Sequence, residues 1–183
     1  MTPSAGLRMM MSVIWPDVET IRTARCRLEP LSAAHADVMV DVLSDPELYK
    51  FIGGTPPTLD QLRRRYRAQS VGHSADRQQW WCNWIVTTLE QARPVGYVQA
   101  TAEGSNGVLE ADVAWVIRPE DQGRGVATEA AAGMIEWLSG HGVIRYVAYI
   151  HPEHTASSGV AFKIGMHRTA VTQDGEIRWE SNR

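Results

Sequence analysis

The stretch Gln122-Gly123-Arg124-Gly125-Val126-Ala127 decides the fold, because it joins an apolar run to a helical pattern. The apolar run, residues 111–117, predicts a strand, and the pattern from about Ala127 to Leu138 predicts a helix. A strand, a glycine-rich turn and a helix in this order form an anion site, because the first backbone N–H groups of a helix are free and its dipole places positive potential there. The two glycines also let the backbone approach a phosphate group closely.

The glycine turn fits neither of two common nucleotide-binding motifs. A Walker A loop needs Gly-Lys-Ser or Gly-Lys-Thr, and Gly125 is followed by Val126. The dinucleotide fingerprint needs a third glycine at a set spacing after Gly123 and Gly125, and none stands there. It also needs two βαβ halves, whereas the turn lies in the C-terminal half of a short chain.

The turn resembles the coenzyme A pyrophosphate loop of the GNAT superfamily of acyl-CoA-dependent N-acetyltransferases. That loop has the pattern Gln/Arg-x-x-Gly-x-Gly/Ala, which Gln122, Gly125 and Ala127 match. Four further segments match in the correct order, and they are Arg27-Leu28-Glu29-Pro30-Leu31, Asp45-Pro46-Glu47-Leu48, the strand and turn 115–121, and Pro152-x-His154-x-x-Ser157 followed by Lys163-Ile164-Gly165-Met166. The two N-terminal segments resemble the branch that contains the ribosomal-protein N-terminal (RimJ/RimL-type) acetyltransferases. The resemblance covers roughly residues 20–180.

The pattern of elements and the resemblance together predict an α/β (α+β) fold. We expect a flexible N-terminal tail over residues 1–19 and one GNAT-like domain over residues 20–183, with a central, mixed, mostly antiparallel sheet of six to seven strands flanked by about four helices. The expected strands cover residues 21–28, 84–89, 95–101, 111–117, 143–150, 166–172 and 177–180. The expected helices cover about 33–43, 59–70, 127–138 and 156–164.

Composition narrows the class of protein. The 183 residues, 44% of them hydrophobic and 21% charged, suit one soluble globular domain. A net charge of −3 gives no basic field to recruit nucleic acid, and no apolar run is long enough to span a membrane. Cys26 and Cys82 are too few for a disulfide framework and are expected to be buried thiols. A cytoplasmic location is therefore expected.

The resemblance implies a set of residues for acetyl-CoA. The backbone N–H groups of the turn are expected to hold the pyrophosphate, and these belong to Gln122, Gly123, Arg124, Gly125, Val126, Ala127 and Thr128. The side chain of Arg124 either pairs with phosphate or stays solvated. The backbone of Trp115, Val116 and Ile117 is expected to meet the pantetheine arm. His154 replaces the family's usual Asn and can still form hydrogen bonds to that arm.

Three residues are candidates for the acid–base chemistry. Asp112 matches the acidic position that many GNAT members have on this strand, and its apolar neighbours predict partial burial and a raised pKa. The other interpretation of Asp112 is a carboxylate paired with an Arg, and Glu110 is the second choice of base. Ser157 could donate to the departing sulfur or could cap a helix. Ala161 stands where many members have a Tyr that protonates the thiolate.

The acceptor side is the least constrained by sequence. Phe51, Trp80, Trp81 and Trp84 are candidates to line the acceptor pocket, and core packing is the competing interpretation for the tryptophans. The basic run 63–67 either attracts an acidic acceptor or forms a solvated helix face. His151 and His154 lack a third ligand nearby in sequence, so no metal site is expected.

These observations favour transfer of an acetyl group from acetyl-CoA to a primary amine by direct attack in a ternary complex. The acceptor is a small molecule or a peptide or protein N-terminus, and neither a nucleic acid nor a membrane partner is expected. A non-catalytic or regulatory CoA-binding module is the alternative, since the usual Tyr and Asn are absent. Nucleic-acid binding through residues 63–67 is a third hypothesis, which the net charge disfavours. A homodimer through edge strands near the C-terminus remains open.

Overall fold

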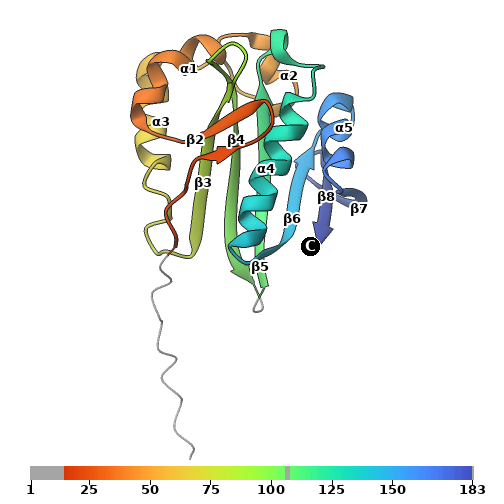
Figure 1. The fold of residues 1–183 in the computed structure, drawn as a ribbon. Helices are drawn as coiled ribbons and strands as arrows, with labels where there is room; N and C mark the ends of the chain where they lie inside the picture. The colour runs from red at the N-terminus through yellow and green to blue at the C-terminus, as the bar shows by residue number, and fades with distance from the viewer. Residues whose placement is uncertain (1–14, 106–107, 183) are drawn as a thin grey trace, which may run out of the picture.

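The structure is a computed structural model and describes residues 15–105 and 108–182. It contains one eight-stranded sheet with the strand order β1-β2-β3-β4-β5-β6-β8-β7 (Figure 1). The strands are β1 (Ile21–Arg22), β2 (Cys26–Pro30), β3 (Gln79–Thr88), β4 (Arg93–Ser105), β5 (Val108–Ile117), β6 (Val143–Ile150), β7 (His167–Gln173) and β8 (Glu176–Asn182). The α-helices are α1 (Ala36–Val42), α2 (Tyr49–Ile52), α3 (Leu59–Gln69), α4 (Val126–Gly140) and α5 (Thr155–Lys163).

The neighbouring strands β5 and β6 are parallel, whereas all other pairs of neighbouring strands are antiparallel. Their pairing runs only from Leu109 opposite Val143 to Asp112 opposite Val147. Beyond Asp112, β5 stays paired with β4 as far as Ile117, and β6 stays paired with β8. The sheet is therefore held together at one end of the β5–β6 pair and divides at the other.

Helix α4 covers one face of the sheet (Figure 1). Its buried residues recur at helical spacing, and they are Val126, Ala130, Ala131, Met134, Ile135 and Leu138. They pack on strand residues that point to the same face, among them Val113, Tyr146 and Ala148. Both cysteines are fully buried free thiols in this core, as the sequence predicts.

Helices α1 and α3 cover the other face of the sheet. Leu62 and Tyr66 of α3 form a second buried cluster with Ile85, against which Tyr97 and Val116 pack. Helix α3 begins where the sequence predicts, because Thr58 accepts from the backbone N–H of Gln61 and the Gln61 side chain accepts from that of Thr58. These helices cover this face over β2–β4. Asp112 lies on the same face, beyond the area that they cover, and is exposed.

The first described residues, 15–19, pack on the domain. This corrects the prediction that they belong to a flexible tail. The Trp15 ring stacks on Trp80 with centroids 5.6 Å apart. The indole N–H of Trp80 donates to the carbonyl of Pro16, and that of Trp84 donates to the carbonyl of Glu19. Residues 15–19 therefore belong to the folded domain, while the rest of the predicted tail, residues 1–14, lies outside the described residues.

The predicted class is confirmed, and the counts change slightly. The sheet has eight strands rather than six or seven, because the short β1 pairs with β2, and the described residues form five α-helices rather than four. Strand β3 begins at Gln79, five residues before the predicted start at Trp84. Among the helices of the described residues, none has both the length and the apolar character that a membrane span requires.

Candidate functional site

The carboxyl ends of β5 and β6 lie at the same edge of the sheet, because the two strands are parallel neighbours. The glycine turn follows β5 there, and the start of α5 follows β6. The strands have already separated at this edge, so each presents a backbone edge that the other does not pair. A crevice outside the carboxyl ends of strands that separate is where open α/β sheets place their ligands.

The glycine turn exposes a row of backbone donors. Gly125 is the N-cap of α4 with φ of 79°, and Gly123 has φ of 74°, so both need the left-handed region that glycine tolerates. No N–H group from Gly123 to Thr128 donates to a backbone carbonyl within the described chain. A Cβ at Gly123 would meet no atom within 4 Å, so the turn is open on that side. The donor set and the open space fit a pyrophosphate group.

The base of the turn is anchored by a buried carboxylate. Asp121 is only 3% exposed and accepts from Nε of Arg118 at 2.5 Å, with Arg93 at 3.3 Å on the same oxygen. The Gln122 side chain donates to the carbonyl of Ile117 at 2.7 Å. The side chain of Gln122 thus fixes the turn to the end of β5. The backbone N–H of Gln122 donates to the carbonyl of Pro119 at 3.2 Å, which corrects the expectation that this N–H holds the pyrophosphate.

A clamp from the β1–β2 turn holds the other side of the glycine turn. Glu129, in the first turn of α4, accepts from the Thr23 hydroxyl at 2.6 Å and from the backbone N–H and Nε of Arg25 at 2.7 and 2.6 Å. Burial alone would raise the pKa of Glu129, but these hydrogen bonds from Thr23 and Arg25 lower it. Arg25 also donates to the carbonyl of Arg124 at 2.9 Å, and its remaining nitrogen lies 3.3 Å from where a Cβ on Gly125 would stand.

The sequence did not single out Arg25, Thr23 or Glu129 as site residues. The available signal was Glu129 itself, an acid in the first turn of the helix that follows the glycine turn. The side chain of Arg124 is exposed, so the structure leaves both interpretations of it open.

Asp112 is the last residue of β5 that pairs with β6, and the sheet divides after it. Its side chain reaches solvent at this edge, and the surrounding protein covers part of the carboxylate, in keeping with the expected partial burial. The pKa of Asp112 is raised to about 6, first because surrounding protein removes part of its hydration and next because Glu176 lies nearby. Glu110 and Glu103 raise it further and Arg178 lowers it.

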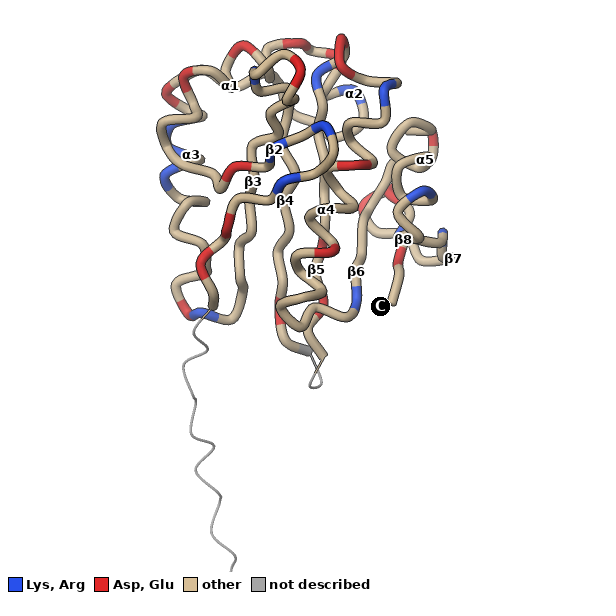
Figure 2. Tube along the Cα trace, in the orientation of Figure 1, with Lys and Arg blue, Asp and Glu red and all other residues tan. Residues whose placement is uncertain are grey.

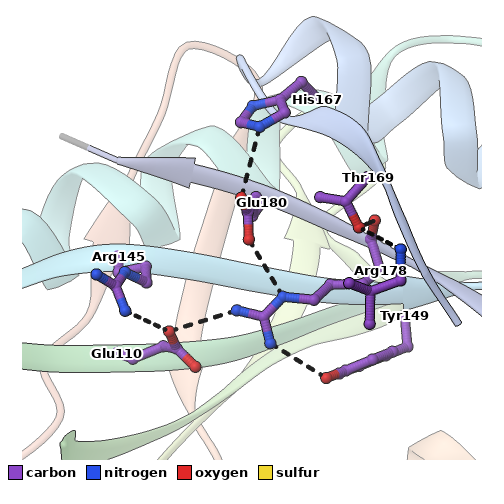
Figure 3. Close-up of polar contacts among 8 residues, drawn as sticks. Glu110, Arg145, Tyr149, His167, Thr169, Arg178 and Glu180 are labelled. Atoms are coloured by element: carbon purple, nitrogen blue, oxygen red, sulfur yellow. Dashed lines mark hydrogen bonds and ion pairs between the residues drawn. The ribbon is translucent and has the colours of Figure 1, made fainter. Parts of the chain in front are cut away.

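Glu110 is tied to two arginines on the same face of the sheet, as Figure 3 shows. Its carboxylate lies 3.4 Å from Arg145 and 3.5 Å from Arg178. Arg178 also contacts Glu180 at 3.2 Å and donates to the Tyr149 hydroxyl at 3.3 Å. These ion pairs occupy the Glu110 carboxylate, so Asp112 is the better placed base.

The start of α5 lies under a phenylalanine from α2. The ring of Phe51 stacks on His154 with centroids 4.5 Å apart and lies 5.3 Å from His151. Burial lowers the pKa of His154, and His151 lowers it further. Ser157 lies inside the helix rather than at the cap, which is His154, and its hydroxyl has no hydrogen bond within the described residues. Ala161 is fully buried, so no side chain takes the place of the usual Tyr there.

The three tryptophans proposed for the acceptor pocket differ in position. Trp80 and Trp84 are at most 1% exposed and belong to the core under α4, where each packs on Trp137. Their indoles are therefore packing residues, which corrects the interpretation of them as acceptor contacts. Trp81 points to the opposite face, which it shares with Asp112, and is half-buried. Only Trp81 of the three stays a candidate for acceptor contact.

A family model described as an acetyltransferase (GNAT) domain matches residues 25–167. The chain belongs to the GNAT family. The resemblance drawn from the glycine turn and its flanking motifs is thereby confirmed. No curated protein matches the chain in sequence. The family's fold accounts for the division of the sheet and for the position of the glycine turn beside it.

Solved GNAT structures share this fold at low sequence identity. An acetyltransferase of the GNAT family from Bacillus anthracis is 20% identical, with a TM-score of 0.70 over 89% of this chain and 98% of that chain. RimL, a ribosomal L7/L12 α-N-protein acetyltransferase solved with coenzyme A, is 14% identical, with a TM-score of 0.73 over 90% and 98% of the two chains. The aminoglycoside acetyltransferase AAC(6')-Ib, solved with coenzyme A, is 16% identical, with a TM-score of 0.71 over 86% and 95%. RimL belongs to the branch that the N-terminal motifs resemble.

Proposed function

We propose that this protein is an acetyl-CoA-dependent N-acetyltransferase that acts by direct attack in a ternary complex. The observation that carries the proposal is the meeting of two features at one edge of the sheet. The free N–H groups of Gly123–Thr128 and the unpaired edge of β5 beyond Asp112 both lie there. A pyrophosphate on the first feature would place the pantetheine arm along the second, on the backbone of Trp115, Val116 and Ile117.

The chemistry needs a neutral amine and a protonated thiol product. The ammonium of the acceptor gives one proton to Asp112, whose raised pKa makes it a stronger base than an ordinary carboxylate. The amine nitrogen then forms a bond to the thioester carbonyl carbon, and the carbon–sulfur bond breaks. The nitrogen loses one further proton as the amide forms, and this balances the proton that the departing thiolate takes up, while Asp112 returns its proton to solvent. The hydroxyl of Ser157 at the start of α5 is the candidate to stabilise the thiolate first. Positioning and fixed backbone donors supply the rest of the rate.

The primary test separates cofactor binding from turnover. Calorimetric titration with CoA and with acetyl-CoA should show binding, and thiol release should depend on an added amine. The Gly125→Trp variant should lose CoA binding, because a bulky side chain fills the turn and the positive φ disfavours it. Gly140→Ala, at the other end of α4 with open space around it, is the matched control and should bind normally. Wild-type protein that binds neither compound contradicts the proposal.

The second candidate is a CoA-binding module without catalysis. Ala161 favours it, since the buried methyl group offers no proton for the thiolate. This candidate predicts CoA binding with no amine-dependent thiol release at any pH. Turnover of one physiological amine excludes it.

A further inference from the structure

We propose that the acceptor is a small amine that also bears a carboxylate, and that Arg65 binds this carboxylate in a cavity between α3 and the sheet. The inference rests on the proposed acetyl transfer and names the class of its second substrate. The cavity has a volume of about 210 Å³. Its polar lining side chains are Arg65, Gln69, Asn83, Tyr97 and Gln99.

The polar groups of the cavity have few partners within the protein. Arg65 pairs with no carboxylate among the described residues, whereas its neighbour Arg63 pairs with Asp37. The side-chain amides of Gln69, Asn83 and Gln99 form no hydrogen bond within the same part of the chain. An arginine beside three such amides offers a dense set of N–H donors, which suits a carboxylate.

One tyrosine contacts the guanidinium of Arg65. Its central carbon lies 5.9 Å from the centroid of the Tyr66 ring, within the range of a cation–π contact. Burial raises the pKa of Tyr97, and the charge of Arg65 opposes that rise. Arg65 is exposed, so a ligand that enters the cavity from solvent can reach its guanidinium. Figure 2 shows the basic positions of α3 at the flank of the molecule opposite α5.

The cavity lies on the same face of the sheet as Asp112. Gln99 pairs with Ala114 across the β4–β5 ladder, and Asn83 pairs with Gln99 on its other side. Asp112 stands two residues before Ala114 on β5, toward Val108. Its side chain therefore points to the same face, roughly 7 Å away along the strand. Asp112 and the cavity therefore lie on one face of the sheet, and an acceptor that joins them has to span more than this offset.

The charges along this face change sign between the two ends. Glu176 and Glu103 add negative charge near Asp112, while Arg145 and Arg178 offset the charge of Glu110, so this end favours a cationic amine. The guanidinium of Arg65 lies at the cavity, away from Asp112, and attracts an anion. A zwitterion whose amine and carboxylate are about 7 Å apart or more satisfies both, and a protonated polyamine does not.

The size of the cavity limits the acceptor further. Its volume is below the range that drug-sized ligands usually occupy, so the part of the acceptor that enters it is a short chain. A dipeptide spans about 7 Å from amine to carboxylate when extended, and a lysine-like ω-amino acid spans a similar length. The proposed class is therefore ω-amino acids and short peptides.

The test compares matched acceptors that differ only in the carboxylate. Thiol release is measured at saturating acetyl-CoA with L-lysine against L-lysinamide and with glycylglycine against its amide. We expect kcat/KM for at least one acid to exceed that for its amide tenfold or more in the wild type. Arg65→Gln should reduce this ratio to near one, and Arg65→Lys should retain part of it, because a lysine keeps the charge without the planar fork.

The control is Arg64→Gln, an exposed neighbour on α3 that does not line the cavity, and its acid-to-amide ratio should match the wild type. Equal kcat/KM for acids and amides in the wild type overturns the inference while acetyl transfer stands. If no amine in the panel turns over, calorimetric titration of the acids into CoA-loaded protein decides, and binding of none of them overturns it. Absence of CoA binding itself contradicts the proposed function instead.

Discussion

Asp112 has both access to solvent and a raised pKa, a combination that suits a base for an ammonium group. The neighbouring Glu110 lies on the same face of the strand, but Arg145 and Arg178 occupy its carboxylate. The sequence placed both carboxylates on one strand and ranked Asp112 first. It could not show the arginine pairs, because Arg145 and Arg178 come from other strands.

The pH dependence of turnover tests Asp112 directly. Only the ionised carboxylate accepts a proton, so kcat/KM should rise with pH through about 6, the raised pKa of Asp112, and any later rise reports the acceptor amine. Asp112→Asn should lower kcat/KM about a hundredfold or more and remove the rise near that pH. Thiol release measured across this range gives the profile. Asp112→Glu retains a base and serves as the control, and an unchanged profile in the Asn variant excludes Asp112 from this role.

Arg25 is a positioning residue for the glycine turn, because it joins Glu129 to the carbonyl of Arg124. Arg25→Leu should raise the KM for acetyl-CoA about tenfold or more, as expected when charge-assisted hydrogen bonds are lost, with kcat nearly unchanged. Arg22→Gln changes an exposed arginine on the adjacent strand β1 and should leave both constants as they are. A fall in kcat at constant KM for Arg25→Leu would contradict the positioning role.

Among the elements, β4 has no room for a side chain at Gly96, which pairs with Ile117, the last residue of β5. A Cβ at Gly96 would stand 2.0 Å from the carbonyl oxygen of Val116, a distance that only a shift of the strand can relieve. Gly96→Ala should therefore destabilise the fold by about 3 kcal/mol, at the upper end of overpacking effects.

Urea denaturation measures this free energy of unfolding. Gly104→Ala, in the same strand with no atom within 4 Å of its Cβ, is the matched control and should be neutral or slightly stabilising. If both variants unfold at the same urea concentration, the close approach of β4 to β5 is not rigid.

Elements with a single dominant pattern were predictable from sequence. The apolar run 143–150 gave the bounds of β6 correctly, and Thr58 gave the start of α3 through its capping chemistry. The first half of β3 was missed because polar Gln79 and Asn83 alternate with its buried residues and carry no strong strand signal. The clamp on the glycine turn joins Arg25 and Glu129 across 104 residues of chain, and no local pattern reports such a contact.

At the scale of the whole molecule, the segment before β1 closes the core along β3. Trp15 stacks on Trp80 and donates its indole N–H to the carbonyl of Arg77. Trp15→Ala should destabilise the protein by about 2 kcal/mol, less than a fully buried tryptophan because Trp15 is half-buried. Thermal unfolding followed by circular dichroism measures the loss. Asp17→Ala, an exposed change in the same segment, should have little effect, and equal unfolding temperatures for the two variants would show that the stack adds no stability.

The short ladder from Leu109 to Asp112 also has a thermodynamic consequence. Strands β6–β8 and helix α5 join the rest of the sheet through this ladder alone among the strand pairs, so they can open as a separate cooperative unit at a lower free energy than global unfolding. A ligand that contacts both open strand edges would bind only the closed arrangement, and it would slow amide hydrogen exchange on each side. Substrate binding would then be coupled to the opening of the sheet, and hydrogen exchange would measure this coupling at each amide.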